Sequence, residues 1–341
     1  MHSSLQQQLI TWYDNTKRDF PWRQTQDPYH IWISEIMLQQ TTTEAVIPYY
    51  NRFLENFPTI FDLAQAKEED VYKAWEGLGY YRRAKHLHLT AQYIVEHYQG
   101  VFPKTYDEVL ALKGIGPYTA GAICSIAYHL PVPAVDGNVL RIMARVNNLH
   151  ENIATTKTQK IITQHVQDLL EHYNPSSLNQ GFMDLGARIC RPKNPKCDEC
   201  PIVSHCQAYH LHQQNVLPIH IKNINHKDIH YITGIITYED RMYIKQNPAG
   251  LLENLYGFIQ YDVESPYSFI ESFENDFHTS LEVVSFIKDI KHVFTHRTWY
   301  MHVYHFVLSE PIDNLYTFNQ IQELPLSTAH LKVLKAFLQN K

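Results

Sequence analysis

The sequence predicts two domains of different fold class, a mainly α-helical N-terminal domain and an α+β C-terminal domain. Up to about residue 210 the apolar residues recur at helical spacing, for example over 63–98 and 155–173. From about residue 229 short runs rich in β-branched and aromatic residues predict strands, and the stretch 327–341 predicts a closing helix. A chain of 341 residues is also long enough for about two domains.

The segment between the two patterns is polar and contains a proline, which is typical of a linker. We therefore predict a helical domain over residues 1–212, a linker over 213–228 and an α+β domain over 229–341.

Composition excludes several classes of protein. A content of 44% hydrophobic and 19% charged residues is typical of a globular chain, and no apolar run is long enough to cross a bilayer. The N-terminus lacks the pattern of a signal peptide, so we expect a cytoplasmic protein without disulfides. The net charge of −6 excludes a broad basic surface, so any binding of nucleic acid must be local.

Cysteines are concentrated in CRPKNPKCDECPIVSHC, residues 190–206, which holds four of the chain's five. The spacing is C-x6-C-x2-C-x5-C, from Cys190, Cys197, Cys200 and Cys206. Four thiolates can hold one zinc ion or a 4Fe-4S cluster. Zinc sites usually consist of two short cysteine pairs, so the unequal arms here favour iron-sulfur without excluding zinc. Cys124 lies in an apolar helical run and is predicted to be a core thiol.

A glycine turn follows residue 112 in LKGIGPYTAGAICSIAYH, which predicts one helix end, a Gly-Ile-Gly turn and a second helix that begins at Pro117. Gly114 and Gly116 would expose backbone N–H groups beside a helix N-terminus, where a DNA phosphate can bind. An ordinary helix connection has the same pattern, so both interpretations stay open at this point.

Two carboxylates are candidates for acid–base chemistry. Glu35 lies in an apolar helix predicted to begin near Pro28, so it either faces water, the default, or is buried with a raised pKa that suits a general acid. Asp136 lies in an Asp-Gly turn before a helix, where an N-cap is the commoner role. The neighbouring Gln40 and Thr41 can probe base edges or be plain surface.

Together, the hairpin, the aspartate after it and the cysteine spacing resemble the helix-hairpin-helix DNA glycosylases of the endonuclease III superfamily. SEIMLQQTTTEAVIPYY, GLGYYRRA, GIGPYTAGAI, VDGNV and NQGFMDLGARIC resemble the adenine DNA glycosylases of the MutY type. The resemblance covers the whole chain, closely up to Cys206 and more loosely beyond it. It implies a monomer with a 4Fe-4S cluster that flips out and excises adenine opposite 8-oxoguanine or guanine in double-stranded DNA.

The resemblance also implies catalytic roles. Glu35 would protonate adenine N7 and then help to activate water, while Asp136 would stabilise the oxocarbenium-like sugar. This division requires carboxyl groups with different pKa values. Tyr118 and Asn138 would orient them. Endonuclease III has a Schiff-base lysine at the position of Tyr118, and a phenol cannot form an imine, so we expect a monofunctional glycosylase.

DNA contacts follow from the same resemblance. Leu38, Gln40 and Tyr80 match positions that fill the base stack when adenine is flipped out, although Tyr80 would equally suit helix-end packing. Positions that contact the DNA backbone are matched by Trp22, Arg23, Thr41, Leu78 and Gly79. Basic residues near them or in the cysteine loop are Arg82, Arg83, Lys85, Arg191, Lys193 and Lys196. We expect the cluster to brace the basic loop and to take no part in the chemistry.

The C-terminal domain resembles a Nudix fold through AGLLENLYGFIQYDVE. The R-E-x-x-E-E helix that holds magnesium in Nudix hydrolases is missing, so we expect a domain that reads DNA without hydrolysing nucleotides. In the family an F-S-H loop inspects 8-oxoguanine, and Phe294, Thr295 and His296 match it here. Threonine keeps the hydroxyl and adds a methyl group, although a threonine at a β-edge can also have no ligand.

Two other functions are compatible with parts of the sequence. One is an endonuclease III-like lyase that acts on oxidised pyrimidines, and Tyr118 argues against it. The other is a catalytically idle iron-sulfur protein that binds DNA, and the presence of Glu35 and Asp136 argues against that.

Overall fold

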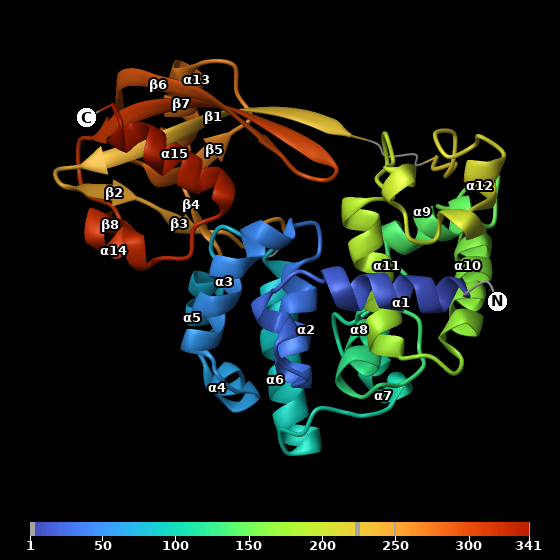
Figure 1. Ribbon diagram of the computed structural model, residues 1–341. Coiled ribbons are helices and arrows are strands. Elements are labelled where there is room, and N and C mark those ends of the chain that lie inside the picture. Colours follow the sequence, from blue (N-terminus) through green and yellow to red (C-terminus); the bar gives the residue numbers. More distant parts are fainter. Residues whose placement is uncertain (1–3, 222–225, 249, 341) are drawn as a thin grey trace. The chain divides into compact units, whose positions relative to one another are not determined.

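The computed structural model describes residues 4–221, 226–248 and 250–340 (Figure 1). The chain forms two compact units. Unit 1 comprises Met1–Gln65 and His86–Lys222, and unit 2 comprises Ala66–Lys85 and Asn223–Lys341. The predicted linker over 213–228 includes residues 222–225, which lie outside the described residues, as does residue 249 in the stretch that resembles a Nudix fold.

Unit 1 is helical, as predicted. Its elements are α1 (Leu5–Thr16), η1 (Pro21–Arg23), α2 (Pro28–Met37), α3 (Thr43–Asn56), α4 (Ile60–Gln65), α6 (Arg82–Tyr98), α7 (Tyr106–Ala111), α8 (Pro117–Ala127), α9 (Gly137–Val146), α10 (Thr156–Leu170), α11 (Pro175–Arg188), η2 (Cys197–Glu199), η3 (Val203–His205) and α12 (Gln207–His210). The unit boundary falls in the first turn of α6. Within the described ranges, no helix is both long and apolar enough to cross a membrane.

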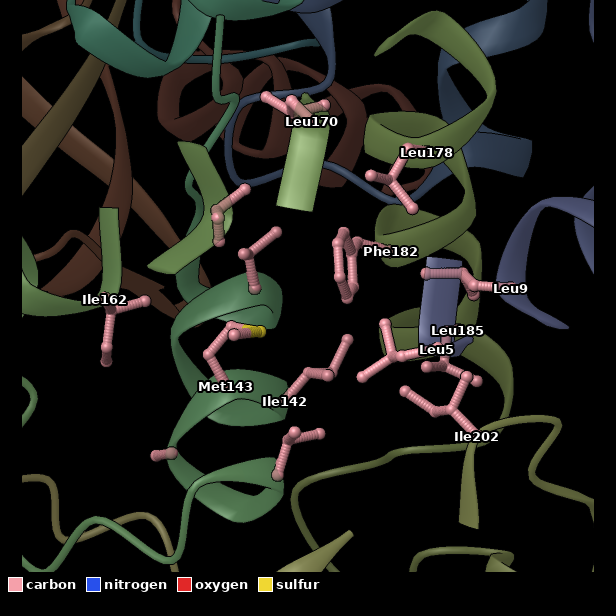
Figure 2. Close-up of a cluster of buried hydrophobic side chains, with 14 of the residues drawn as sticks. Leu5, Leu9, Ile142, Met143, Ile162, Leu170, Leu178, Phe182, Leu185 and Ile202 are labelled. Atoms are coloured by element: carbon pink, nitrogen blue, oxygen red, sulfur yellow. The ribbon is translucent and has the colours of Figure 1, made fainter. Parts of the chain in front are cut away.

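The core of unit 1 forms where α1, α9, α10 and α11 bury their apolar faces against one another (Figure 2). On α10, Ile162, Val166 and Leu170 follow one another at intervals of one helical turn and are all fully buried. The ring of Phe182 on α11 lies in the same cluster and is also fully buried. This packing fixes α9 and α11, the helices that carry residues of the candidate site.

The predicted hairpin is present between α7 and α8. A capping box of Thr105 and Glu108 begins α7, and α8 begins at Pro117 with Gly116 as its N-cap. Gly114 has φ +82°, and a Cβ added there would lie 2.6 Å from the Cβ of His86. The turn therefore needs glycine both for its left-handed backbone and for its close approach to α6.

Unit 2 contains the predicted strands and closing helix. Its elements are α5 (Glu68–Ala74), β1 (Lys227–Tyr238), β2 (Arg241–Tyr243), β3 (Lys245–Gln246), β4 (Tyr256–Gly257), β5 (Ile259–Tyr261), α13 (Pro266–Phe277), β6 (Leu281–Val293), β7 (Arg297–Leu308), β8 (Leu315–Thr317), α14 (Phe318–Glu323) and α15 (Thr328–Leu338). The main sheet has the order β6-β7-β1-β2-β8, with β5 also paired to β1. Strands β1 and β7 are parallel, and the other pairs of this sheet are antiparallel.

Helices α13 and α15 cover opposite faces of this sheet. Ile235 on β1 packs in a cluster with Val333 of α15, whereas the next residue, Ile236, packs in a cluster with Phe273 of α13. Successive residues of a strand point to opposite faces, so one apolar strand supplies both cores.

The segment Ala66–Lys85 belongs to unit 2, although we assigned it to the helical domain from its sequence. The Lys85 Nζ lies 2.6 Å from Glu253 Oε1, and the Tyr81 hydroxyl donates to the carbonyl of Leu326 at 2.9 Å. The backbone N–H of Leu326 donates to Glu76 Oε1 at 3.1 Å. Helical periodicity predicts the local structure of such a segment and not the partner against which it packs.

Candidate active site and cysteine cavity

A single pocket of unit 1 collects the four residues that the sequence analysis proposed for catalysis. Its volume is about 420 Å³, and its walls come from η1, α2, α3, α8, α9 and α11 together with the segments next to them. Glu35, Tyr118, Asp136 and Asn138 all line it. The volume lies in the range of sites that enclose small organic groups.

Glu35 is held in the pocket by α2, which is buried along almost its whole length. Asp27 caps the helix by accepting from the N–H of Tyr29 at 2.8 Å, and every residue from Ile31 to Met37 is buried. The Glu35 side chain is 5% exposed, and its Oε2 has no hydrogen-bond partner among the described residues. Burial raises the pKa of Glu35 from 4.5 to about 7, and the charge of Asp136 adds to this rise. Burial with a raised pKa, the less common alternative, is therefore what the structure shows.

Two neighbours oppose the rise in the pKa of Glu35. The hydroxyl of Tyr118 lowers that pKa by hydrogen bonding to the carboxylate, and the positive charge of Arg23 lowers it further. The same hydroxyl lies 3.8 Å from the sulfur of Met183. Burial, together with the charges of Glu35 and Asp136, raises the pKa of Tyr118 well above 10. Tyr118 is thus a neutral phenol that can donate a hydrogen bond to Glu35 or to a ligand.

Asp136 is the N-cap of α9 and also lines the pocket. Its Oδ1 accepts from the backbone N–H groups of Asn138 and Val139, both at 2.9 Å. Its Oδ2 accepts from the Asn138 side-chain amide at 2.7 Å. Three N–H donors stabilise a negative charge on this carboxylate. The N-cap and the pocket carboxylate, treated as alternatives from the sequence, are the same group.

A chain of hydrogen bonds runs from Asp136 to the cysteine loop. Asn138, bonded to Asp136, accepts at its Oδ1 from Arg141 Nη2 at 2.9 Å. Arg141 Nε donates to the carbonyl of Cys190 at 2.8 Å, and Arg145 Nη1 lies 3.2 Å from the Cys190 sulfur. Our sequence reasoning missed both arginines. Their signal resembles that of Glu35, because both arginines lie among the apolar residues of GNVLRIMARV.

The four clustered cysteines line a second cavity of unit 1. None of the five cysteines of the chain forms a disulfide bond. Burial, together with the neighbouring cysteines, raises the pKa of Cys200 to about 12 and also raises the pKa values of Cys197 and Cys206. Across the described parts of the chain, no three His, Cys, Asp or Glu side chains are placed to hold a single metal ion. A cavity that gathers four cysteine sulfurs, whose thiolates need positive charge, fits an iron-sulfur cluster.

The predicted DNA contacts of unit 1 fall into two groups. Leu38 and Thr41 line the pocket. Gln40, between them in sequence, is exposed and has a left-handed backbone with φ +59°. The second group consists of Trp22 and Arg23, whose side chains are directed into the protein. Trp22 is 6% exposed, and its ring stacks on that of Phe20 with the ring centres 4.9 Å apart. Arg23 forms hydrogen bonds of 2.9 and 3.0 Å with the buried Asp184. The side chains of Trp22 and Arg23 thus build the pocket wall.

In unit 2 the structure brings together two residues that the sequence analysis treated separately. The hydroxyls of Tyr80 and Thr295 lie 2.8 Å apart. Leu78 is buried, Gly79 has φ +71°, and Tyr80 is 49% exposed with φ +50°. A tight turn with left-handed backbone therefore presents the Tyr80 ring.

The Phe294-Thr295-His296 triplet forms the turn between β6 and β7. The N–H of Phe294 donates to the carbonyl of Arg297 at 2.8 Å, which closes the turn. The ring of Phe294 packs edge-on against Trp299 at 4.8 Å, whereas Thr295 and His296 are exposed. The turn is thus anchored by its phenylalanine and presents a hydroxyl and an imidazole.

Three family models match separate parts of this chain. Residues 33–171 match the HhH-GPD superfamily of base excision DNA repair proteins, residues 190–206 the iron-sulfur binding domain of endonuclease III, and residues 232–336 the NUDIX domain. An adenine DNA glycosylase of Buchnera aphidicola subsp. Schizaphis graminum is 33% identical over 320 residues, which cover 86% of this chain and 92% of that protein. The chain belongs to the adenine DNA glycosylase family.

One further relative and two solved structures are also similar to this chain. The human adenine DNA glycosylase is 39% identical over 218 residues, or 61% of this chain and 40% of that protein. A thermostable thymine-DNA glycosylase of known structure is 28% identical and covers 60% of this chain and 94% of its own, with a TM-score of 0.54. Endonuclease III in a non-covalent DNA complex, 20% identical, shares the fold over 62% of this chain and all of its own with a TM-score of 0.52.

Family membership confirms the predicted fold classes and decides the choice of metal. The protein is an adenine DNA glycosylase of base excision repair that acts on DNA, and the loop 190–206 carries a 4Fe-4S cluster. Zinc, which the cysteine spacing alone left open, is thereby excluded.

Proposed function

We propose that the enzyme removes adenine mispaired with 8-oxoguanine or guanine in double-stranded DNA, as a monomer and without cutting the strand. The observation that carries the proposal is the pairing of two unlike acids in one pocket: a buried Glu35 whose pKa is about 7 and an Asp136 that accepts three hydrogen bonds. The first can hold a proton near neutral pH, and the second carries negative charge.

Glu35 donates its proton to N7 of the flipped adenine. The electron pair of the C1′–N9 bond then passes to the base, which leaves as neutral adenine, and positive charge develops on the sugar. Asp136 stabilises that charge, and a water adds to C1′ as its proton returns to a carboxylate of the pocket. Asn138 fixes the orientation of Asp136, and the neutral phenol of Tyr118 donates to Glu35 once that carboxylate is ionised.

Strand cleavage by a glycosylase needs an amine that attacks the sugar. The described residues that line the pocket include no lysine, and Tyr118 occupies the position next to Glu35. An imine cannot form on a phenol, which supports a monofunctional enzyme.

We assign the cluster to Cys190, Cys197, Cys200 and Cys206, because these thiols line one cavity. When bound, the iron ions of the cluster would supply positive charge and cross-link the four thiolates, which would hold the loop 190–206 in shape. Arg191 and Lys193 are exposed on this loop, whereas Lys196 pairs with Glu199 at 2.9 Å. We infer that the first two contact DNA phosphates. Because Arg141 bonds both to the carbonyl of Cys190 and to Asn138, we infer that the loop helps to hold Asp136 in place.

Recognition of the base opposite adenine is assigned to Tyr80 and to the turn at Thr295. Both side chains are exposed, and their hydroxyls are already within hydrogen-bond distance. An aromatic ring can replace lost base stacking, and a hydroxyl can pair with the polar edge of 8-oxoguanine.

The test is adenine release from duplexes that contain A·8-oxoG, A·G or A·T, with cluster-loaded protein under single-turnover conditions. We expect release from the two mispairs, no release from A·T, and strand breaks only after alkali treatment. Glu35→Gln and Asp136→Asn are expected to abolish release and to keep binding of the mispair. Wild-type protein that releases no adenine, or that cuts the strand without alkali, would contradict the proposal.

A further inference from the structure

Asp184 is a buried carboxylate in the wall of the active-site pocket that none of the steps above uses. It lies on α11 and is 1% exposed. Its Oδ1 accepts from Arg18 Nη2 at 2.8 Å and from Arg23 Nη2 at 2.9 Å, and its Oδ2 accepts from Arg23 Nη1 at 3.0 Å. The geometry with Arg23 is bidentate, the arrangement that positions a guanidinium most firmly.

Arg23 is held in place from several sides. Besides Asp184, its Nη1 donates to the carbonyl of Arg18 at 3.2 Å, and its guanidinium lies 5.1 Å from the centre of the Phe20 ring. Its side chain is 12% exposed, so water screens its charge little. Arg23 and Glu35 line the same pocket, and the positive charge of Arg23 lowers the pKa of Glu35.

We propose that Asp184 is a positioning residue of the reaction, which offsets the charge of Arg23 beside the pocket so that Glu35 keeps its proton at neutral pH. The proposal rests on the role of Glu35 as the general acid. Without the carboxylate of Asp184, the buried guanidinium of Arg23 would lose its bidentate ion pair and keep its positive charge. Glu35 is the other carboxyl whose charge acts on Arg23, so its ionisation would then relieve that charge.

All charged and titratable groups that line the pocket enter this balance. Besides Glu35 itself, they are Arg18, Arg23, Glu44, Tyr118, Asp136 and Asp184. Glu44 is far less effective than Asp184, because its side chain is 71% exposed and its ion pair, at 3.3 Å, is with Arg18. The negative charge of Asp136 and that of Asp184 both favour the proton on Glu35, the first directly and the second by pairing with Arg23.

The experiment compares the pH dependence of single-turnover adenine release across neutrality for three variants of the cluster-loaded full chain. For Asp184→Asn we expect the falling limb of the profile to move to lower pH by about one unit, which is the lower end of the effect of an unpaired neighbouring charge. For Arg23→Gln, in which Asp184 still pairs with Arg18, we expect the limb to move to higher pH. The double variant should return towards the wild-type midpoint, because both charges are then absent.

A purely structural role for Asp184 would lower the rate or the melting temperature and leave the midpoint of the limb unchanged. That result, or a shift of Asp184→Asn to higher pH, overturns the inference. If Asp184→Asn does not fold, Arg23→Gln decides alone, and an unchanged or lowered midpoint refutes the idea. Glu35→Gln separates the two proposals: if it stays active, the role of Glu35 fails, and if it is inactive while the limb of Asp184→Asn stays in place, only this inference fails.

Discussion

Replacing Glu35 by glutamine should stabilise the protein at alkaline pH while it removes activity. The pKa of Glu35 is raised by burial from 4.5 to about 7, so the folded state binds this proton more tightly than the unfolded state. Below the unfolded pKa the carboxyl is neutral in both states and costs nothing. As pH rises through the folded pKa, the full cost of ionising a buried group develops, and the shift corresponds to roughly 3 kcal/mol.

Glutamine copies the protonated acid and cannot ionise. We therefore expect Glu35→Gln to gain roughly 3 kcal/mol of unfolding free energy relative to wild type between about pH 4.5 and about pH 8. Any hydrogen bond that the glutamine side chain gains or loses has the same effect at both pH values. The change with pH in the stability difference between variant and wild type therefore reports the ionisation of Glu35 alone. Denaturant melts of the full chain, followed by near-UV circular dichroism, measure this unfolding free energy. The matched control is Glu55→Gln, because Glu55 is an exposed glutamate on α3. A stability difference that does not change with pH would refute the buried, proton-holding state of Glu35.

Three further predictions concern other parts of the molecule. Phe182→Ala should lower the unfolding free energy by about 3–5 kcal/mol, measured by denaturant melts, because the ring is fully buried in the core of Figure 2; a loss below about 1 kcal/mol would contradict the packing. Cys200→Ser should lose the broad visible absorption of the cluster and the melting temperature together, and retention of both would remove Cys200 from the ligand set. Thr295→Val should reduce the preference for A·8-oxoG over A·G in competition kinetics and keep release from A·G, and an unchanged preference would leave the hydroxyl without a role.

The fold was predictable from the sequence wherever one element decides its own structure. The periodicity of 155–173 predicted α10, the Gly-Ile-Gly turn predicted the hairpin, and the β-rich runs predicted the sheet of unit 2. Even the burial of Glu35 has a sequence signal, because PYHIWISEIM is apolar all around the helix, and such a helix is buried on every side. We gave solvent exposure as the default and thereby underused that signal.

Contacts between distant residues were not predictable in the same way. Arg23 and Asp184 lie 161 positions apart, and Tyr80 and Thr295 lie 215 positions apart. Each pair consists of polar residues that are common on protein surfaces, so the sequence around one member does not predict its contact with the other. The same reasoning explains why the segment Ala66–Lys85 was assigned to the helical domain: its amphipathic pattern fixes a buried face and leaves open what covers it.

The two acids of the pocket are coupled, and this coupling changes how a mutation at Asp136 is interpreted. The negative charge of Asp136 contributes to the raised pKa of Glu35, so a charged Asp136 and a protonated Glu35 favour each other. Asp136→Asn therefore removes two things at once, the charge that stabilises the sugar and part of the force that keeps the proton on Glu35. The positive charge of Arg23 lowers the pKa of Glu35, and Asp184 forms an ion pair with Arg23. In our proposal the protonation of Glu35 therefore depends on three charges, those of Asp136, Arg23 and Asp184, which come from separate segments. The loss of activity in Asp136→Asn thus measures the pair, and only the pH profile of a variant that keeps both acids, such as Asp184→Asn, reports on Glu35 alone.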